Sequence, residues 1–369
     1  MVWLPFKIIQ KSFLGIDIGT AAIKIVEISR WGERRKLEAY GELPSQTIFE
    51  KPFLTFERSS LLLSSPEIAQ AISAIIKEAK IRSREVIFSI PDFSSFFTNF
   101  VLPPMTKEEL PMAIRYEARL HVPLPLSEVT LDWRVIEGEV SDKKATPLKV
   151  LLVSVPNEVI NQYQKIAELS NLKLLALEAE VFGLLRSLIK EAKPLANPKI
   201  VISLIDIGAQ STTCSIIDEG VLKISHSFDL AGNNLTNQIT QSLSIDWEKA
   251  ENFKKKYGIL PPSLSGGGWE QQNITNALLP LIDSIISEIE KIFDNFYQSE
   301  GKKVEKIILA GGTALLPGLK EYFSEKIGKE IEIANPFSNI FYPPILEKTL
   351  EEMGPAYAIA VGLALRGLE

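Results

Sequence analysis

The sequence of 369 residues contains few of the side chains from which disulfides and metal clusters are built. Cys214 is its only cysteine, which excludes an internal disulfide and a thiolate metal cluster. The two histidines, His121 and His226, are too few for a histidine metal site, and each is expected at the surface or in the core. These scarcities exclude thiolate and histidine metal centres.

Long apolar runs and basic blocks are missing as well. No apolar run approaches the ~20 residues that span a membrane, and the apolar residues 2–9 are too short for a secretory signal with its cleavage site. We expect residues 2–9 to form a clasp on the fold, with a weak membrane-surface contact as the alternative. The net charge is −6, from 40 basic and 46 acidic residues, and residues 254–256 form one short basic block, which argues against a nucleic-acid partner. These absences predict a cytoplasmic protein without a transmembrane segment.

The most informative stretch of the sequence is a motif that occurs twice. Residues 16–19 and 205–208 both read Ile-Asp-Ile-Gly, and strand-like apolar runs flank both copies. In the first copy, Asp17 ends one run, Gly19 lies in a tight turn, and Lys24 lies on the next run. Two hairpins, each with a carboxylate at its turn, indicate a duplicated chain whose halves close on one ligand.

Composition and periodicity predict an α/β protein. An apolar content of 46% and a charged content of 23% are typical of a globular protein, and the length suggests two or three domains. Helices are predicted over residues 66–80, 106–120, 157–169, 181–192, 233–243, 246–257, 274–297, 317–327 and 357–365. Strands are predicted over residues 13–29 (a hairpin), 36–43, 85–90, 129–136, 148–155, 172–177, 306–310 and 330–333. Ser65 is the expected N-cap of the first helix, and loops are expected over residues 44–66, 141–146, 194–198 and 261–269.

Aromatic and proline residues crowd the sequence between two predicted strands of the first half, which indicates an insertion. We interpret residues 86–155 as a small α+β insert. The first lobe then comprises residues 12–85 and 156–196. The second lobe comprises residues 199–369, and residues 230–304 form its smaller subdomain.

The repeated motif provides what a nucleoside triphosphate with Mg²⁺ needs. Glycine turns present backbone N–H groups to phosphates at close range. Mg²⁺ keeps several waters, which carboxylates such as Asp17 and Asp206 can hold, and Lys24 can reach the phosphate oxygens. Gly311 and Gly312, directly after a predicted strand, allow a flat adenosine to approach the backbone.

These three segments resemble the phosphate-1, phosphate-2 and adenosine motifs of the actin, sugar kinase and Hsp70 superfamily, over nearly the whole chain. The insert points to one family within this superfamily. Its residues 102–109, 113–118, 122–125 and 132–133 are similar to the corresponding segments of the PilM family. PilM proteins are cytoplasmic actin-like proteins of the type IV pilus assembly platform and relatives of the cell-division protein FtsA. The resemblance implies a duplicated actin-like (ribonuclease H-like) ATPase fold, with two lobes around a nucleotide cleft.

The resemblance also implies ATP and Mg²⁺ as cofactors. Asp17 and Asp206 would hold the hydrated metal. The other implied nucleotide contacts are Gly19, Thr20, Lys24, Gly208, Ser211 and Thr212 at the phosphates, Glu251 and Lys254 at the ribose, and Gly311, Gly312 and Thr313 at the adenosine. Glu180 matches the glutamate that orients the attacking water in bacterial actins, so Glu180 and Asp206 are the implied catalytic residues. Two positions depart from the family pattern: Ala209-Gln210 replaces Gly-Gly, and Val181 replaces proline. At most slow hydrolysis is therefore expected.

Each candidate residue also has a purely structural interpretation. The two aspartates could only stabilise their turns, and Lys24 could be a solvated surface lysine. Glu180 at a helix start would be favoured by the helix dipole alone. Glu251 and Lys254 could form an exposed helix face.

Three functions compete on these grounds. In the favoured one, ATP closes the two halves of a scaffold and shapes a groove between the first lobe and the insert. The resemblance implies that this groove takes the short cytoplasmic tail of a PilN-like inner-membrane protein. PilO-like and motor ATPase components would belong to the same assembly, and the chain would attach to the inner membrane through its partner. The alternatives are an ATPase whose turnover drives assembly and a sugar kinase, which the insert and the lack of an aspartate-bearing sugar segment oppose. Actin-like folds can also stack head to tail, so self-association is possible.

Overall fold

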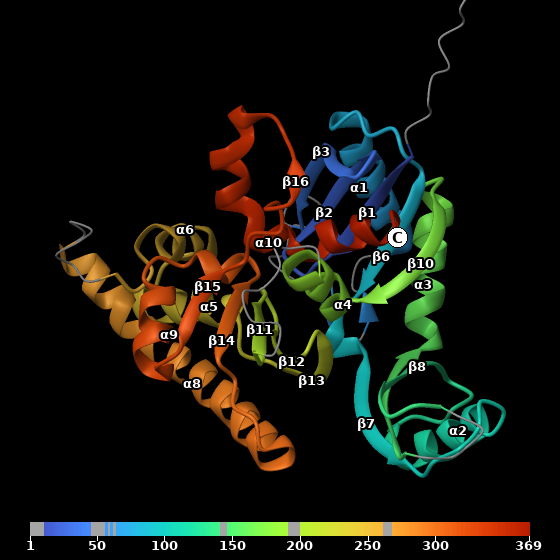
Figure 1. Ribbon diagram of the computed structural model, residues 1–369. Coiled ribbons are helices and arrows are strands. Elements are labelled where there is room, and N and C mark those ends of the chain that lie inside the picture. The colour runs from blue at the N-terminus through green and yellow to red at the C-terminus, as the bar shows by residue number, and fades with distance from the viewer. Residues whose placement is uncertain are drawn as a thin grey trace, which may run out of the picture.

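The computed structural model describes residues 11–45, 56–57, 60–61, 64–140, 146–190, 200–260 and 268–369. Within these ranges the chain forms two large sheets with helices packed around them, and a smaller sheet lies to one side (Figure 1). The expected clasp at residues 2–9, the linker at 194–198 and most of the loops at 44–66, 141–146 and 261–269 lie outside the described residues. No helix in the described part of the chain has both the length and the apolar character that crossing a membrane requires.

The first sheet is built around the first copy of the motif. Its strands lie in the order β10 (Lys173–Ala179), β6 (Glu85–Ile90), β1 (Ser12–Ile18), β2 (Ala22–Trp31), β3 (Arg34–Pro44) and β16 (Ile340–Phe341). β1, β2 and β3 are antiparallel, whereas β6 runs parallel to β1, so the carboxyl ends of β1 and β6 share one edge. Asp17 and Lys24 are cross-strand partners, which puts their side chains on the same face.

Alternation along β1 separates the two faces of this sheet. Leu14, Ile16 and Ile18 pack against α1 (Ser65–Glu78) and α3 (Asn157–Leu169). Gly15 lies on the opposite face, where α10 (Glu347–Arg366) crosses so closely that a Cβ on Gly15 would lie 1.9 Å from the carbonyl oxygen of Ala360. Asp17 belongs to the same alternating set as Gly15, so it faces the α10 side.

The second sheet repeats the hairpin. Its strands lie in the order β13 (Val221–Phe228), β12 (Thr212–Asp218), β11 (Ile202–Ile207), β14 (Lys306–Ala310) and β15 (Glu330–Ile333). Its helices are α5 (Gly232–Leu243), α6 (Trp247–Tyr257), α8 (Gly268–Glu300) and α9 (Leu319–Ile327). Ile205 and Ile207 pack with these helices, whereas Ile202 and Leu204 pack with α4 (Glu180–Leu185) and α10. Asp206 alternates with Ile202 and Leu204, so it too faces the space between the sheets.

A third sheet, with strand order β7 (Phe96–Leu102), β9 (Leu148–Pro156) and β8 (Val129–Glu137), packs on α2 (Leu110–His121) at the lower right of Figure 1. The chain runs directly from the first sheet into this third sheet, and side-chain bonds connect the third sheet to the second half of the molecule. Lys223 on β13 pairs with Glu137, and Lys149 on β9 pairs with Glu300 at the end of α8. The Asn99 side-chain amide donates to the Lys223 carbonyl. The smaller elements are β4 (Phe56–Glu57), β5 (Ser60–Leu61), the 3₁₀ turns Asp92–Ser94, Gly312–Leu315 and Pro344–Leu346, and a π-helix, Arg186–Lys190, that continues α4.

The duplicated α/β arrangement and most predicted elements are confirmed, with differences that have local causes. The N-cap of α1 is Ser64, not Ser65, because the Ser64 hydroxyl and N–H both donate to Glu67. α8 and α10 begin before their predicted starts, since their first turns are polar and carry no apolar period. β7 and β13 were not predicted. The domain boundaries stay a prediction, and the packing of β16 and α10 on the first sheet would assign both elements to the first lobe.

Candidate functional site

The two hairpins enclose a cavity of about 830 Å³ between the halves of the molecule. Their turns are closed by equivalent bonds: the Gly19 N–H donates to the Ala22 carbonyl at 3.1 Å, and the Gly208 N–H donates to the Ser211 carbonyl at 3.0 Å. The predicted site residues that line the cavity are Asp17, Gly19, Thr20, Lys24, Glu180, Asp206, Gly208, Ser211, Glu251, Lys254, Gly311, Gly312 and Thr313. Residues far apart in the sequence are thus brought to one place.

Thr212 is the predicted residue that does not line this cavity. Its hydroxyl donates to the Leu230 carbonyl at 2.6 Å, and its side chain is fully buried. Neighbouring side chains on a strand point to opposite faces, so Ser211 and Thr213 reach the cavity and Thr212 cannot.

Asp17 is held by the first half alone. It is 3% exposed, its Oδ1 accepts the Ser89 hydroxyl at 2.9 Å, and its Oδ2 lies 3.9 Å from the Lys24 ammonium. Burial raises the pKa of the Asp17 carboxyl, while Lys24 and Ser89 act in the opposite direction. Lys24 is therefore an ion-pair partner within the cleft and not a solvated surface lysine.

Asp206 lies beside a glycine that no other residue could replace. Its strand β11 pairs with β14, which leads directly into Gly311 at a φ of +83°. A Cβ on Gly311 would lie 2.4 Å from both the Asp206 Oδ1 and the Ile207 carbonyl oxygen. Burial, and secondarily the charge of Asp17, raise the pKa of Asp206 to about 6.

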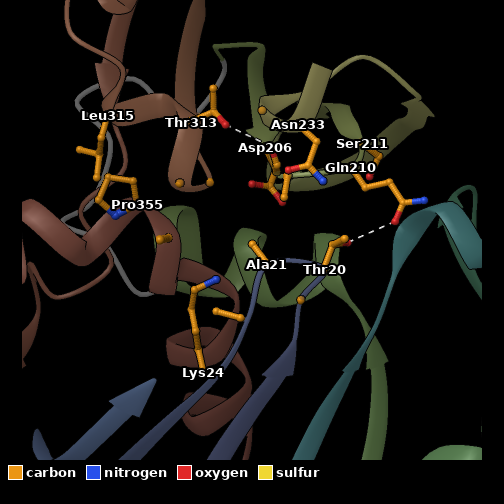
Figure 2. Close-up of a pocket in the computed structure, with 18 of the residues that line it drawn as sticks. Thr20, Ala21, Lys24, Asp206, Gln210, Ser211, Asn233, Thr313, Leu315 and Pro355 are labelled. Carbon is orange, nitrogen blue, oxygen red and sulfur yellow. Dashed lines mark hydrogen bonds between the residues drawn. The ribbon is translucent and has the colours of Figure 1, made fainter. Parts of the chain in front are cut away.

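One side-chain hydrogen bond joins the two hairpin turns across the cleft. The Thr20 hydroxyl donates to the Gln210 side-chain oxygen at 3.5 Å, as Figure 2 shows. Gln210 stands where bacterial actins have glycine, so the departure from the family pattern supplies a contact between the halves. Thr313 similarly donates to the Gly208 carbonyl at 3.1 Å, which fixes the second turn against the loop after β14.

Lys254 and Glu251 form a buried network on α6. The Lys254 ammonium lies 2.7 Å from the Glu251 carboxylate, and it donates to the Thr236 hydroxyl at 2.7 Å and to the Gly232 carbonyl at 3.0 Å. Burial lowers the pKa of Lys254. These contacts exclude the interpretation that Glu251 and Lys254 form only an exposed helix face, because they hold α5 and α6 together beside the cavity.

Sequence reasoning missed Asp92, which is hydrogen-bonded to the cavity residue Glu180 and its neighbour. The Asp92 N–H donates to the Glu180 carboxylate at 3.1 Å, and the Asp92 carboxylate accepts the Val181 N–H at 3.3 Å. Burial raises the pKa of Asp92 to about 8, and burial together with Asp92, Asp17 and Asp206 raises that of Glu180 well above its usual range. The signal was available: Asp92 follows β6, whose carboxyl end lies beside that of β1.

The acidic groups fit a hydrated divalent cation better than a directly ligated one. Among the described residues, no three acidic, histidine or cysteine side chains converge as metal ligands. Asp17 and Asp206 nevertheless repel each other through the cavity, because the charge of Asp17 raises the pKa of Asp206. Such a site favours added positive charge, and Mg²⁺ binds through its waters in this way.

Apolar side chains also line the cavity: Leu315, Leu316, Pro355, Ala356 and Ile359, with Glu352 among them. In Figure 2, Leu315 and Pro355 lie together on the side away from Thr20 and Gln210. The cavity is therefore divided into a polar part, at the two turns, and a part suited to a flat apolar ring.

Comparisons with known proteins agree with this geometry. A solved PilM-PilN type IV pilus biogenesis complex contains a chain that matches 96% of this one over 98% of its own length, with a TM-score of 0.83 and 25% identity. MreB5 of Spiroplasma citri, solved bound to AMPPNP, matches 95% of this chain and 94% of its own, with a TM-score of 0.53 and 14% identity, which shows the fold alone. The fold is thus that of the actin-like ATPases.

The family is shown by sequence. The family model for the type IV pilus assembly protein PilM matches residues 15–368, and the chain belongs to this family. It is an actin-like protein of type IV pilus assembly. FtsA of Streptococcus pneumoniae is 22% identical over 88% of this chain and 75% of its own length. FtsA of Buchnera aphidicola is 29% identical over 46% of this chain. That match covers 44% of the length of the Buchnera protein, which is less than half.

Proposed function

We propose that this chain is an ATP-binding scaffold of the type IV pilus inner-membrane assembly platform. The observation that carries the proposal is the divided cavity of about 830 Å³, with carboxylates and glycine turns at one end and apolar side chains at the other. The proposed molecule consists of a first lobe at residues 12–85 and 156–196, an insert at 86–155, and a second lobe at 199–369.

In this proposal the two hairpins hold the phosphates and the loop after β14 holds the base. The two turns, with Gly19, Thr20, Gly208 and Ser211, line the polar end, and Lys24 adds a positive charge. Bound Mg²⁺ would neutralise phosphate oxygens through waters held by Asp17 and Asp206. Glu251 and Lys254 lie towards the ribose, and Gly312 and Thr313 towards the adenosine.

The partner we propose is the short cytoplasmic tail of a PilN-like inner-membrane protein, bound in a groove between the first lobe and the insert. The support is the similarity to a chain solved as a PilM-PilN complex. The pairs Lys223–Glu137 and Lys149–Glu300 attach the insert to the second half, so closure of the nucleotide cleft would move the insert against the first lobe. Through this tail the chain would be attached to the cytoplasmic face of the inner membrane, in an assembly with PilO-like and motor ATPase components.

Binding of a tail peptide tests the coupling between the two sites. Fluorescence anisotropy of a labelled PilN-like tail would be measured with Mg-ATP, with Mg-ADP and without nucleotide. Tighter binding with Mg-ATP supports the proposal. Equal affinity in all three states would show that the nucleotide does not shape the groove, and no binding in any state would remove the partner.

A second candidate function is ATP hydrolysis, favoured by the position of Glu180 at the cavity. Phosphate release from Mg-ATP would be followed with and without the tail peptide, in the wild type, Asp206→Ala and Glu180→Ala. We expect ATP to be retained with little turnover. Turnover that rises with the peptide and is lost in both variants would instead make the chain a partner-triggered ATPase, and unchanged turnover in Glu180→Ala would remove this residue from the reaction.

A further inference from the structure

The end of the first sheet that lies away from the cavity is rich in basic side chains. β1 begins at Ser12 at this end and reaches the cavity at Asp17. Because β6 runs parallel to β1 and β10 runs parallel to β6, the amino ends of all three strands meet at one edge. The turn that joins β2 to β3 lies at the same edge, and Figure 1 shows these strands side by side.

Basic residues outnumber acidic ones along this edge. Residues 11–12, 27–38, 80–85 and 173 include nine basic and four acidic residues, in a chain whose net charge is −6. We call the nine the basic edge: Lys11, Arg30, Arg34, Arg35, Lys36, Lys80, Arg82, Arg84 and Lys173. Arg35 and Lys36 are half-buried, and the others are exposed. The adjoining helix ends contribute Lys77 with Glu78 and Arg366 with Glu369, and so add no net charge.

The acidic side chains of this edge already have partners. Glu27 is buried and accepts hydrogen bonds from the N–H groups of Arg82 and Ser83. The other three, Glu33, Glu38 and Glu85, each pair with a basic side chain of the edge, at 3.8, 2.9 and 2.7 Å. These carboxylates offset only part of the positive charge, so the edge attracts an anionic partner.

An exposed tryptophan lies at the tip of the β2–β3 hairpin. Trp31 is the last residue of β2 and is 66% exposed. Arg30 precedes it in the sequence, and Arg34 is its partner across the hairpin. Tryptophan is enriched where a bilayer meets water, and arginine side chains there reach the lipid phosphates while their apolar stems lie lower. Trp31 between two arginines therefore has the chemistry of a membrane-surface contact.

The chain also joins the fold beside this tryptophan. Ser12, the first residue of β1, pairs with Ser29, two residues before Trp31. Residues 2–9, which precede it in the sequence and lie outside the described residues, are apolar except for Lys7. Because that segment is attached at the basic edge, any apolar contact that it makes with a bilayer would add to the contact of Trp31.

We propose that the basic edge binds directly to the headgroups of an anionic phospholipid bilayer, with Trp31 in the headgroup layer. The contact is reversible and depends on salt, because it consists mainly of exposed charges. None of the residues of the basic edge lines the nucleotide cavity, which lies at the other ends of the strands. The inference does not rest on the proposed function, since it gives the chain a lipid contact of its own that needs neither nucleotide nor a partner protein.

Binding of the purified chain to vesicles, with no partner present, tests this contact. Sedimentation would compare vesicles of phosphatidylcholine alone with vesicles that also contain phosphatidylglycerol. We expect binding to the anionic vesicles only, and weaker binding as salt is raised. Arg34→Glu with Arg82→Glu should weaken this binding at least about tenfold, and Trp31→Ala should weaken it about threefold.

The matched control is Arg115→Glu with Arg119→Glu on α2, which changes the net charge equally at exposed positions of the third sheet's helix (Figure 1). It should bind anionic vesicles as the wild type does, and circular dichroism would establish that all variants are folded. A wild type that does not bind anionic vesicles at low salt overturns the proposal, as does an edge variant that binds as tightly as the wild type.

Two further outcomes would assign these surfaces differently. If only the control variant loses vesicle binding, α2 is the membrane contact and the proposal is wrong. If the wild type binds duplex DNA but not anionic vesicles, and the edge variant loses the DNA binding, the basic edge is a nucleic-acid contact and the proposal is equally overturned.

Discussion

The two hairpins at the cavity share four identical residues and the same turn bond, yet they differ in what surrounds them. Across the first hairpin, Asp17 is paired with Lys24, while across the second, Asp206 is paired with Thr213. The first carboxylate thus has a cation and a serine hydroxyl for partners. The second is crowded instead by backbone, because Gly311 lies directly against it.

This difference shows that the two copies of the motif have different roles at the cavity. The first hairpin supplies a cation to the cavity, through Lys24, and the second hairpin together with the loop after β14 supplies close backbone approach, through Gly208 and Gly311. Because Asp206 has no cationic partner as close as the one that Asp17 has, its raised pKa of about 6 describes a carboxylate that gains from added positive charge. The halves are therefore complementary and not interchangeable, and the following experiments test that statement.

The largest effect is expected where the second hairpin depends on glycine. Gly311→Val places side-chain atoms against Asp206 and the Ile207 carbonyl at a backbone angle that valine disfavours, so we expect a loss of about 3 kcal/mol of unfolding free energy and of ATP binding. Urea unfolding and equilibrium dialysis would measure these. Gly312→Ala is the control for stability in the same loop, since a Cβ there meets no protein atom within 4 Å; a similar loss of unfolding free energy in the control would contradict the argument.

The two aspartates should respond differently to neutralisation. We expect Asp206→Asn to weaken Mg-dependent ATP binding by about 10- to 100-fold while leaving the nucleotide-free protein as stable or more stable, because a buried repulsion is removed. Asp17→Asn should weaken binding similarly but gain less stability, because Lys24 loses its partner and this loss offsets part of the relief of the buried charge. Calorimetric titration with and without Mg²⁺, together with thermal unfolding, would distinguish them. Equal stability changes in the two variants would refute the asymmetry.

Stability should also depend on pH in a direction set by the raised pKa values. Asp206 and Asp92 titrate in the folded protein near 6 and 8, above the ordinary value of 3.8. Their contribution to stability is therefore complete below about pH 4 and is lost as the pH rises through 6 and 8. For the nucleotide-free protein we expect a decrease on the order of 1 kcal/mol or more from these groups between pH 5 and 8. Urea unfolding at each pH would measure this decrease. In Asp92→Asn, the decrease in unfolding free energy between pH 6 and 8 should be smaller than in the wild type.

The smallest effect is expected at the bond that joins the turns. Thr20→Ala removes a 3.5 Å hydrogen bond to Gln210, worth about 0.5 kcal/mol, so release of labelled ATP should accelerate about twofold. Gln210→Ala should do the same, and the double variant should add nothing further. Additive effects in the double variant would mean that the two side chains act separately.

The sequence was most informative where local pattern and chemistry coincide. The repeated Ile-Asp-Ile-Gly predicts the turns and the carboxylates, because a hairpin forms between neighbouring segments of the chain, and the glycine pair directly after an apolar run predicts the loop at Gly311 and Gly312. Ser211 lines the cavity, whereas strand alternation turns Thr212, which was also expected at the phosphates, inwards; that Ser211 contacts a nucleotide stays a prediction. The register of the hairpin, in which Asp206 pairs with Thr213, decides which of these side chains faces the cavity.

Other features depend on contacts that sequence does not display. β13 is recognisable only as the strand beside β12, since its polar side chains have partners elsewhere in the fold: Ser225 bonds to Ser215 on β12, and Lys223 pairs with Glu137 on β8. Asp92 gains its importance from α4, which lies 88 residues away in the chain. The start of α10 is charged and contains Pro355, so no apolar period marks it as part of a helix that crosses the first sheet.

That helix has a consequence for how the protein is made. Val26, Ile28 and Leu37, from the first strands to be synthesised, are covered by Tyr357, Ala360, Val361 and Ala364 near the C-terminal end of the described chain. The first half therefore cannot complete its hydrophobic core while the ribosome is still translating the second. Its sheet must wait, partly uncovered, until α10 emerges, so the order of synthesis is not the order in which the halves become complete.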